Sequence, residues 1–93
     1  MSPLEQIQEL VGLGAFTLLK HCRDGMRAHR IKSSDALAIV MRATECHKQD
    51  DGRYRFEGYD LSDNDVRAIV ELKLAPEGEV VFISVHLVVA EGG

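Results

Sequence analysis

The C-terminal half of the chain alternates apolar and polar residues with the period of β-strands. Segment 65–74 reads DVRAIVELKL and segment 79–89 reads EVVFISVHLVV, with APEG between them. Successive side chains of a strand point to opposite faces of a sheet, so this alternation predicts one buried and one exposed face. A third segment, RYRFEGYD at 53–60, precedes them across the turn-forming LSDN. Connections this short predict antiparallel hairpins.

The N-terminal half favours helices, and the first of them has a well-defined start. Ser2 can cap free backbone N–H groups, Pro3 suits the first helical position, and Glu5 stands where a capping box places its acid. Gly12 and Gly14 then predict the end of this helix.

Further helices are expected over 20–30 and from Ser33 to about Thr44, the latter signalled by Ser33-Ser34-Asp35. Residues 15–19, AFTLL, fit either a short strand or the first turn of a helix, and 47–52, HKQDDG, is expected to be a loop. A chain of 93 residues has room for one core. The prediction is therefore a single α+β domain over 1–93, with two or three N-terminal helices packed on one face of a three- to four-stranded antiparallel meander sheet.

The hairpin register follows if the APEG turn pairs Leu74 with Glu79. The predicted apolar pairs are then Leu72 with Val81, Val70 with Ile83 and Ala68 with Val85. The opposite, polar face pairs Arg67 with His86, and on that face we expect Val80 and Phe82 as well.

Charge is segregated in this acidic chain, whose formal net charge is −4. One group of cations forms a stripe at helical spacing: Lys20, Arg23, Arg27 and Arg30. The other group shares the polar sheet face: Arg53, Arg55, Arg67, Lys73 and His86. Either surface is a candidate site for nucleic acid, and either also fits an ordinary solvated face.

Several protein classes are excluded by simple features. No apolar run approaches the roughly 20 residues that span a bilayer, so no membrane association is expected. The segment MSPLEQIQEL holds two Glu and no Lys or Arg, which is not the pattern of a signal peptide. Cys22 and Cys46 form no CxxC pair, so reduced thiols and a cytoplasmic location are expected.

The order of segments resembles a bacterial domain family of unknown function that is grouped with the RelE/ParE-like toxin superfamily. His21, Met26 and Ile31 match its short motif of a His, an Arg-Met pair and an Arg-Gly-Ile triplet. Gly25 and His29 replace the two arginines of that motif, and Arg30 replaces its glycine. The resemblance implies helices on one face of a curved antiparallel sheet, contact with RNA or the ribosome, and an antitoxin-like protein partner.

Metal-independent cleavage of RNA needs a base for the 2′-OH, an acid for the leaving oxygen and cations for the phosphorane. His86, Arg67 and Arg55 can supply the base and the cations, and Glu71 or Glu57 a second proton-transfer group. The same residues also fit ordinary cross-strand ion pairs.

Two other kinds of function fit parts of the sequence. The pairs His21-Cys22 and Cys46-His47 contain zinc-type ligands, but adjacent helical residues point about 100° apart, so no metal or other cofactor is predicted and Cys22 is expected in the core. The alternative function is a non-catalytic interaction domain that forms homodimers or docks a partner through its sheet. Its expected contact residues are Val80, Phe82, Val88 and Val89.

Overall fold

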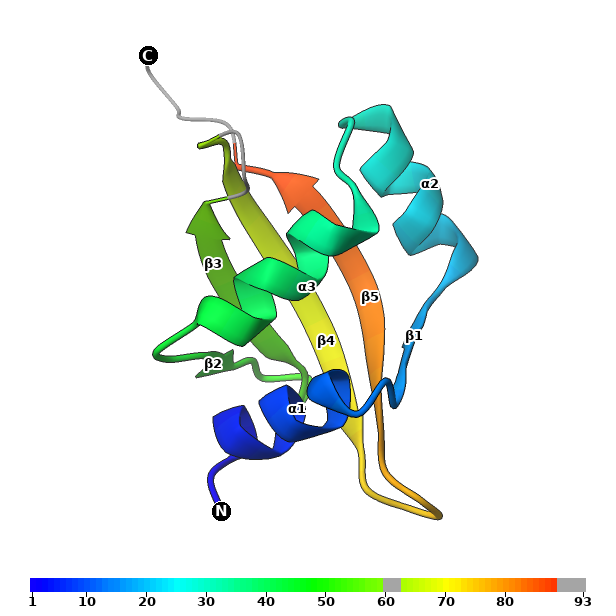
Figure 1. The fold of residues 1–93 in the computed structure, drawn as a ribbon, viewed down its shortest axis with the longest axis vertical. Coiled ribbons are helices and arrows are strands. Elements are labelled where there is room, and N and C mark those ends of the chain that lie inside the picture. Colours follow the sequence, from blue (N-terminus) through cyan, green and yellow to red (C-terminus); the bar gives the residue numbers. More distant parts are fainter. Residues whose placement is uncertain (60–62, 89–93) are drawn as a thin grey trace.

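The chain folds into three helices and a five-stranded sheet in the computed structural model, which describes residues 1–59 and 63–88. The elements are α1 (Pro3–Gly12), β1 (Phe16–Leu18), α2 (Lys20–Ala28), α3 (Ser33–Arg42), β2 (His47–Lys48), β3 (Tyr54–Tyr59), β4 (Asp65–Lys73) and β5 (Glu79–Leu87). In the described part of the chain all three helices cover one face of the sheet (Figure 1). The opposite face is called the helix-free face below. The predicted α+β plan is confirmed.

The sheet is mixed, with strand order β1-β5-β4-β3-β2. The predicted antiparallel meander is correct for β3, β4 and β5, but the prediction of a wholly antiparallel sheet of three or four strands is wrong. Residues 16–18 form an edge strand parallel to β5, and His47 and Lys48, predicted in a loop, pair with β3. Segments of two or three residues are too short to show periodicity, and backbone pairing alone defines these strands.

The predicted starts of α1 and α3 are present, although α3 is capped by a different residue from the one expected. Ser2 Oγ accepts a hydrogen bond from the Glu5 N–H at 3.2 Å, as the capping box requires. At α3 the carboxylate of Asp35 accepts from the Lys32 N–H at 3.1 Å, so this acid rather than a serine caps the first turn.

The register between β4 and β5 corrects part of the predicted pairing. Arg67 opposes His86 and Ala68 opposes Val85 as expected, but the ladder shifts by one residue between Ile69 and Val70. Beyond this bulge Phe82, not Ile83, opposes Val70. The remaining pairs of that half are Leu72 with Val80, Glu71 with Val81 and Lys73 with Glu79.

The bulge reverses which side chains of β5 reach the core. Val80 and Phe82, expected on the polar face, are fully buried, and the Phe82 ring meets Phe16 of β1 edge-on with the ring centres 6.1 Å apart. Val81 lies outside the main core cluster, on the helix-free face. An extra residue in one strand shifts its alternation by one, which is why the two halves of β5 differ.

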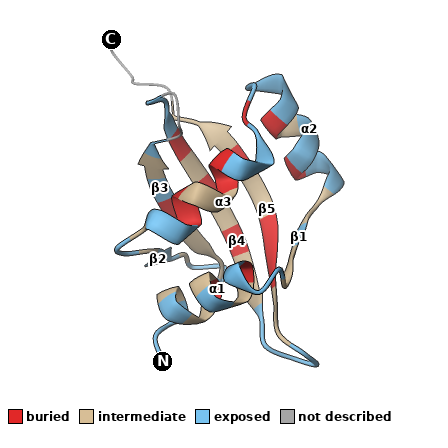
Figure 2. Ribbon diagram, viewed as in Figure 1, coloured by how far each residue is buried: buried red, intermediate tan, exposed pale blue. Residues whose placement is uncertain are grey.

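The core lies between the sheet and the helices (Figure 2). Cys22 and Met26 of α2 are buried there, as the sequence predicts, together with Ile7 of α1 and Val40 of α3. Among the described residues no helix combines the length and the apolar character needed to cross a membrane.

Candidate nucleic-acid interface

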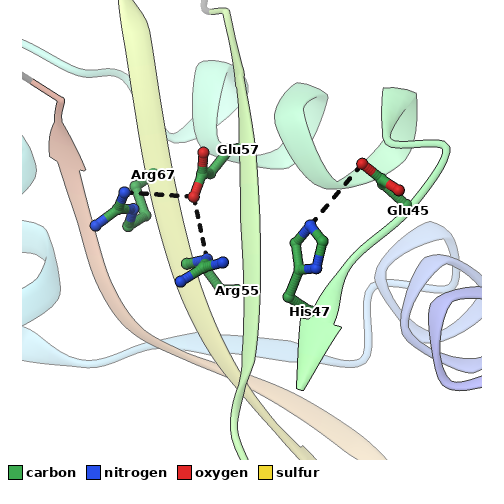
Figure 3. Close-up of polar contacts among 5 residues, drawn as sticks. All are labelled: Glu45, His47, Arg55, Glu57 and Arg67. Atoms are coloured by element: carbon green, nitrogen blue, oxygen red, sulfur yellow. Dashed lines mark ion pairs between the residues drawn. The ribbon is translucent and has the colours of Figure 1, made fainter. Parts of the chain in front are cut away.

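Two arginines share one carboxylate on the helix-free face. Oε1 of Glu57 lies 3.0 Å from Nε of Arg55 and 3.3 Å from Nη2 of Arg67 (Figure 3). Arg55 and Glu57 are two residues apart in β3 and therefore share a face, and Glu57 opposes Arg67 in β4. This group of three residues, the Arg55–Glu57–Arg67 cluster, carries a net positive charge and leaves most guanidinium donors free for another anion.

Both arginines of this cluster are partly withdrawn from water. Each side chain is 36% exposed, and the Nε atoms of both are buried without a well-aligned hydrogen bond among the described residues. Arg55 Nε is close to the Glu57 carboxylate, but the angle does not satisfy a hydrogen bond. Half-desolvated cations that share one carboxylate favour an additional anion, because the field of the unpaired charge is poorly screened.

His86 stands beside this cluster, opposite Arg67 and half-buried. Burial lowers the pKa of His86 below its ordinary value, and the nearby charges of Arg67 and His29 lower it further. The imidazole is therefore neutral at neutral pH, which is the form that accepts a proton from a substrate hydroxyl.

The other predicted residues of the sheet lie apart from this centre. Glu71 opposes Val81 and is four residues from Arg67 along β4, about 13 Å at the rise of a strand. Glu57, the other predicted proton-transfer group, opposes Arg67 from β3, so that β4 lies between it and His86. Arg53 lies 3.8 Å from Asp51 in the β2–β3 turn, and Lys73 opposes Glu79 at the far end of its hairpin.

The predicted stripe is only partly helical, because α2 ends at Ala28 and Arg30 lies in the turn beyond it, and its members have different surroundings. Lys20 forms an exposed ion pair with Asp24 at 3.3 Å. Arg23, Arg27 and Arg30 instead line a groove between α2 and the start of α3.

Sequence reasoning missed one cation of this groove. Lys32 joins the three arginines there. Its position directly before the helix predicted from Ser33 was the available signal.

The cysteine-containing pairs do not form a metal centre in the described part of the chain, where no three His, Cys, Asp or Glu side chains are placed to share an ion. Cys22 is 1% exposed, and its Sγ lies 3.9 Å from Sδ of Met26. Burial raises the pKa of Cys22 and of Cys46, which disfavours a reactive thiolate at either residue. Nε2 of His47 lies 3.8 Å from Oε1 of Glu45 (Figure 3).

Comparison with known proteins adds no assignment to this site. No protein-family model matches the chain, and no curated protein shows significant similarity to its sequence. The function proposed below therefore depends on the geometry of the helix-free face.

Proposed function

We propose that this protein is a RelE/ParE-like domain that contacts single-stranded RNA through the helix-free face of its sheet. The observation that carries the proposal is the Arg55–Glu57–Arg67 cluster beside the neutral imidazole of His86. Guanidinium groups offer paired N–H donors that match the oxygens of a phosphodiester, and Glu57 holds two of them on one surface. The resemblance of the order of segments along the chain to a family grouped with the toxin superfamily supports RNA as the anion.

The overall acidity of the chain does not oppose this surface. A net charge of −4 weakens long-range attraction to RNA. Within about 10 Å, however, local charge dominates at ordinary ionic strength. The acids of α1, Glu5 and Glu9, belong to an element on the opposite side of the sheet.

The same geometry supports binding more strongly than cleavage. His86 is suited to accept the 2′-OH proton, and Arg55 and Arg67 are suited to stabilise a phosphorane. Glu57 contacts both guanidinium groups, so it orients them rather than protonating a leaving oxygen. Asp65 shares this face two residues before Arg67, but it is exposed and makes no ion pair with Arg67 or His86 among the described residues, so RNA contact is the function we propose.

A second candidate is an interaction domain, favoured by one observation. Of its predicted contact residues, Val80 and Phe82 are in the core, Val88 is half-buried and Val89 lies outside the described residues. Ile69 and Ile83, both half-buried, nevertheless form an apolar strip on the helix-free face beside the buried Val81. A second copy of the chain that covered this strip would make a dimer.

Fluorescence anisotropy with a labelled single-stranded RNA of mixed sequence tests the first proposal. Replacing both Arg55 and Arg67 with Glu should weaken binding at least about a hundredfold, since two charge-assisted contacts become repulsive. The matched control replaces Lys20 and Lys48, two exposed cations outside the site, with Glu. Absence of binding at low salt, or equal loss in both variants, rejects the proposal. Sedimentation of the wild-type protein as a dimer that Ile83→Asp dissociates favours the second candidate.

A further inference from the structure

A groove of about 440 Å³ lies between the C-terminal end of α2 and the start of α3. Four cations line it, namely Arg23, Arg27, Arg30 and Lys32, and no acidic residue does. Its volume falls in the range of small-molecule sites, which is about 300–1,000 Å³. In a chain with more acids than bases, a lining of this composition points to an anionic ligand.

The backbone at the end of α2 builds this groove. The Ile31 N–H donates to the Met26 carbonyl at 2.8 Å, and the Arg30 N–H donates to the Arg27 carbonyl at 3.1 Å. These two bonds form a Schellman motif, which requires a left-handed residue at the position of Arg30. Arg30 adopts φ 57°, although glycine is the residue that accepts this conformation without cost. An arginine held in a strained conformation at the mouth of a basic groove is consistent with a functional role.

The arginines of the groove are not neutralised by neighbouring acids. Within the described residues, Arg23, Arg27 and Arg30 make no ion pair, whereas Arg53, Arg55 and Arg67 each have a carboxylate within 4 Å. Met26 and Ile31, both almost fully buried, close the floor beneath them. Three guanidinium groups and an ammonium group therefore surround one small, partly apolar volume.

We propose that this groove binds a phosphate monoester, either the terminal phosphate of an RNA strand or that of a free mononucleotide. A monoester carries close to two negative charges at neutral pH, against one for a phosphodiester, so a cluster of four cations favours it. The Lys32 N–H is not available to the phosphate, because the carboxylate of Asp35 accepts it. For the RNA arm the inference builds on the proposed function, because the RNA that contacts the helix-free face would supply the terminal phosphate.

Titration calorimetry with inorganic phosphate and with adenosine monophosphate tests the groove without RNA. Replacing Arg23 and Arg27 with Gln should raise the Kd for both ligands by about tenfold or more. The matched control, Lys20→Gln with Arg42→Gln, removes the same charge from outside the groove and should change the Kd by less than about twofold. All four side chains are exposed, so thermal unfolding should be unchanged in both variants. Absence of binding to the wild-type protein, or an equal loss in the control, overturns the proposal.

The source of the phosphate is separated by three RNA strands of one sequence, with a 5′-phosphate, a 3′-phosphate or neither. If the groove holds a strand end, one phosphorylated strand binds more tightly than the unmodified strand, and the Arg23/Arg27 variant removes the preference. If all three strands bind alike while adenosine monophosphate still binds the groove, the ligand is a free nucleotide. Binding of the unmodified strand depends on Arg55 and Arg67, so its loss reports failure of the proposed function and not of the groove.

Discussion

Arg67 lies directly opposite His86 in the ladder between β4 and β5, and its guanidinium group helps to keep the imidazole neutral. Burial is the larger cause of the lowered pKa of His86, Arg67 is the next and His29 the third. Arg67→Gln should therefore raise the pKa of His86 toward its ordinary value without restoring it fully. An NMR titration of the imidazole Cε1–H resonance measures this change. Arg53→Gln is the control, since Arg53 contacts Asp51, and an unchanged His86 pKa in Arg67→Gln would contradict the electrostatic pairing.

The same residue predicts how stability depends on pH. Because the pKa of His86 is lower in the folded protein than the ordinary 6.5, the unfolded chain takes up the proton first as the pH falls. The stability associated with neutral His86 is fully present above pH 6.5 and is lost as the pH falls through the lower folded pKa. His86→Gln should therefore reduce the loss of unfolding free energy between about pH 7.5 and about pH 5.5. Urea denaturation at both pH values checks this, and an identical loss in both proteins would refute it.

The bulge in β5 predicts that truncating two neighbouring residues costs very different amounts of unfolding free energy. Phe82 is fully buried against Phe16, whereas Ile83 is half-buried outside the main core cluster. Phe82→Ala should cost about 3–5 kcal/mol of unfolding free energy, and Ile83→Ala clearly less, about 1–2 kcal/mol. Chemical denaturation of both variants measures the difference. A larger loss for Ile83→Ala than for Phe82→Ala would indicate that Ile83 lies in the core, as in the register without a bulge, and would contradict the bulge.

The segment VVFISV explains why the sequence predicts the strand but not its register. Residues 80–83 are all apolar, so both registers place apolar side chains in the core. The choice depends on β1, whose Phe16 and Leu18 pair with Val80 and Phe82. This contact between residues more than sixty positions apart leaves no periodic signal in the chain.

The sequence likewise predicts which face of the sheet carries the candidate site but not which residues meet there. Alternation alone placed Arg55, Arg67 and His86 on one face, because the register is correct in that half of the hairpin. It also placed Glu71 on this face, since alternation defines the side of the sheet and not the distance along a strand. The importance of Glu57 depends on β3 pairing with β4, and the groove depends on the turn at Arg30, neither of which periodicity reveals.

Arg30 is predicted to bind phosphate at a cost to stability. Arg30→Gly relieves the left-handed backbone and should raise the unfolding free energy by about 1 kcal/mol. The same variant loses one cation of the groove and should bind adenosine monophosphate more weakly than the wild-type protein. Thermal unfolding and calorimetry on one sample measure both changes. Ala28→Gly, in the last residue of α2, is the control and should only destabilise. If the Arg30→Gly variant is less stable than the wild-type protein, the claim that the backbone of Arg30 is strained is wrong.

The salt dependence of RNA binding tests the central claim most directly. For a single strand, the logarithm of the binding constant falls against the logarithm of salt concentration with a slope of about −0.7 per phosphate contacted. If Arg55 and Arg67 each neutralise one phosphate, replacing both with Gln should make the slope shallower by about 1.4, while Lys20→Gln with Lys48→Gln leaves it unchanged. A slope that is the same in the Arg55/Arg67 variant and the wild-type protein would show that RNA does not contact the helix-free face at these arginines.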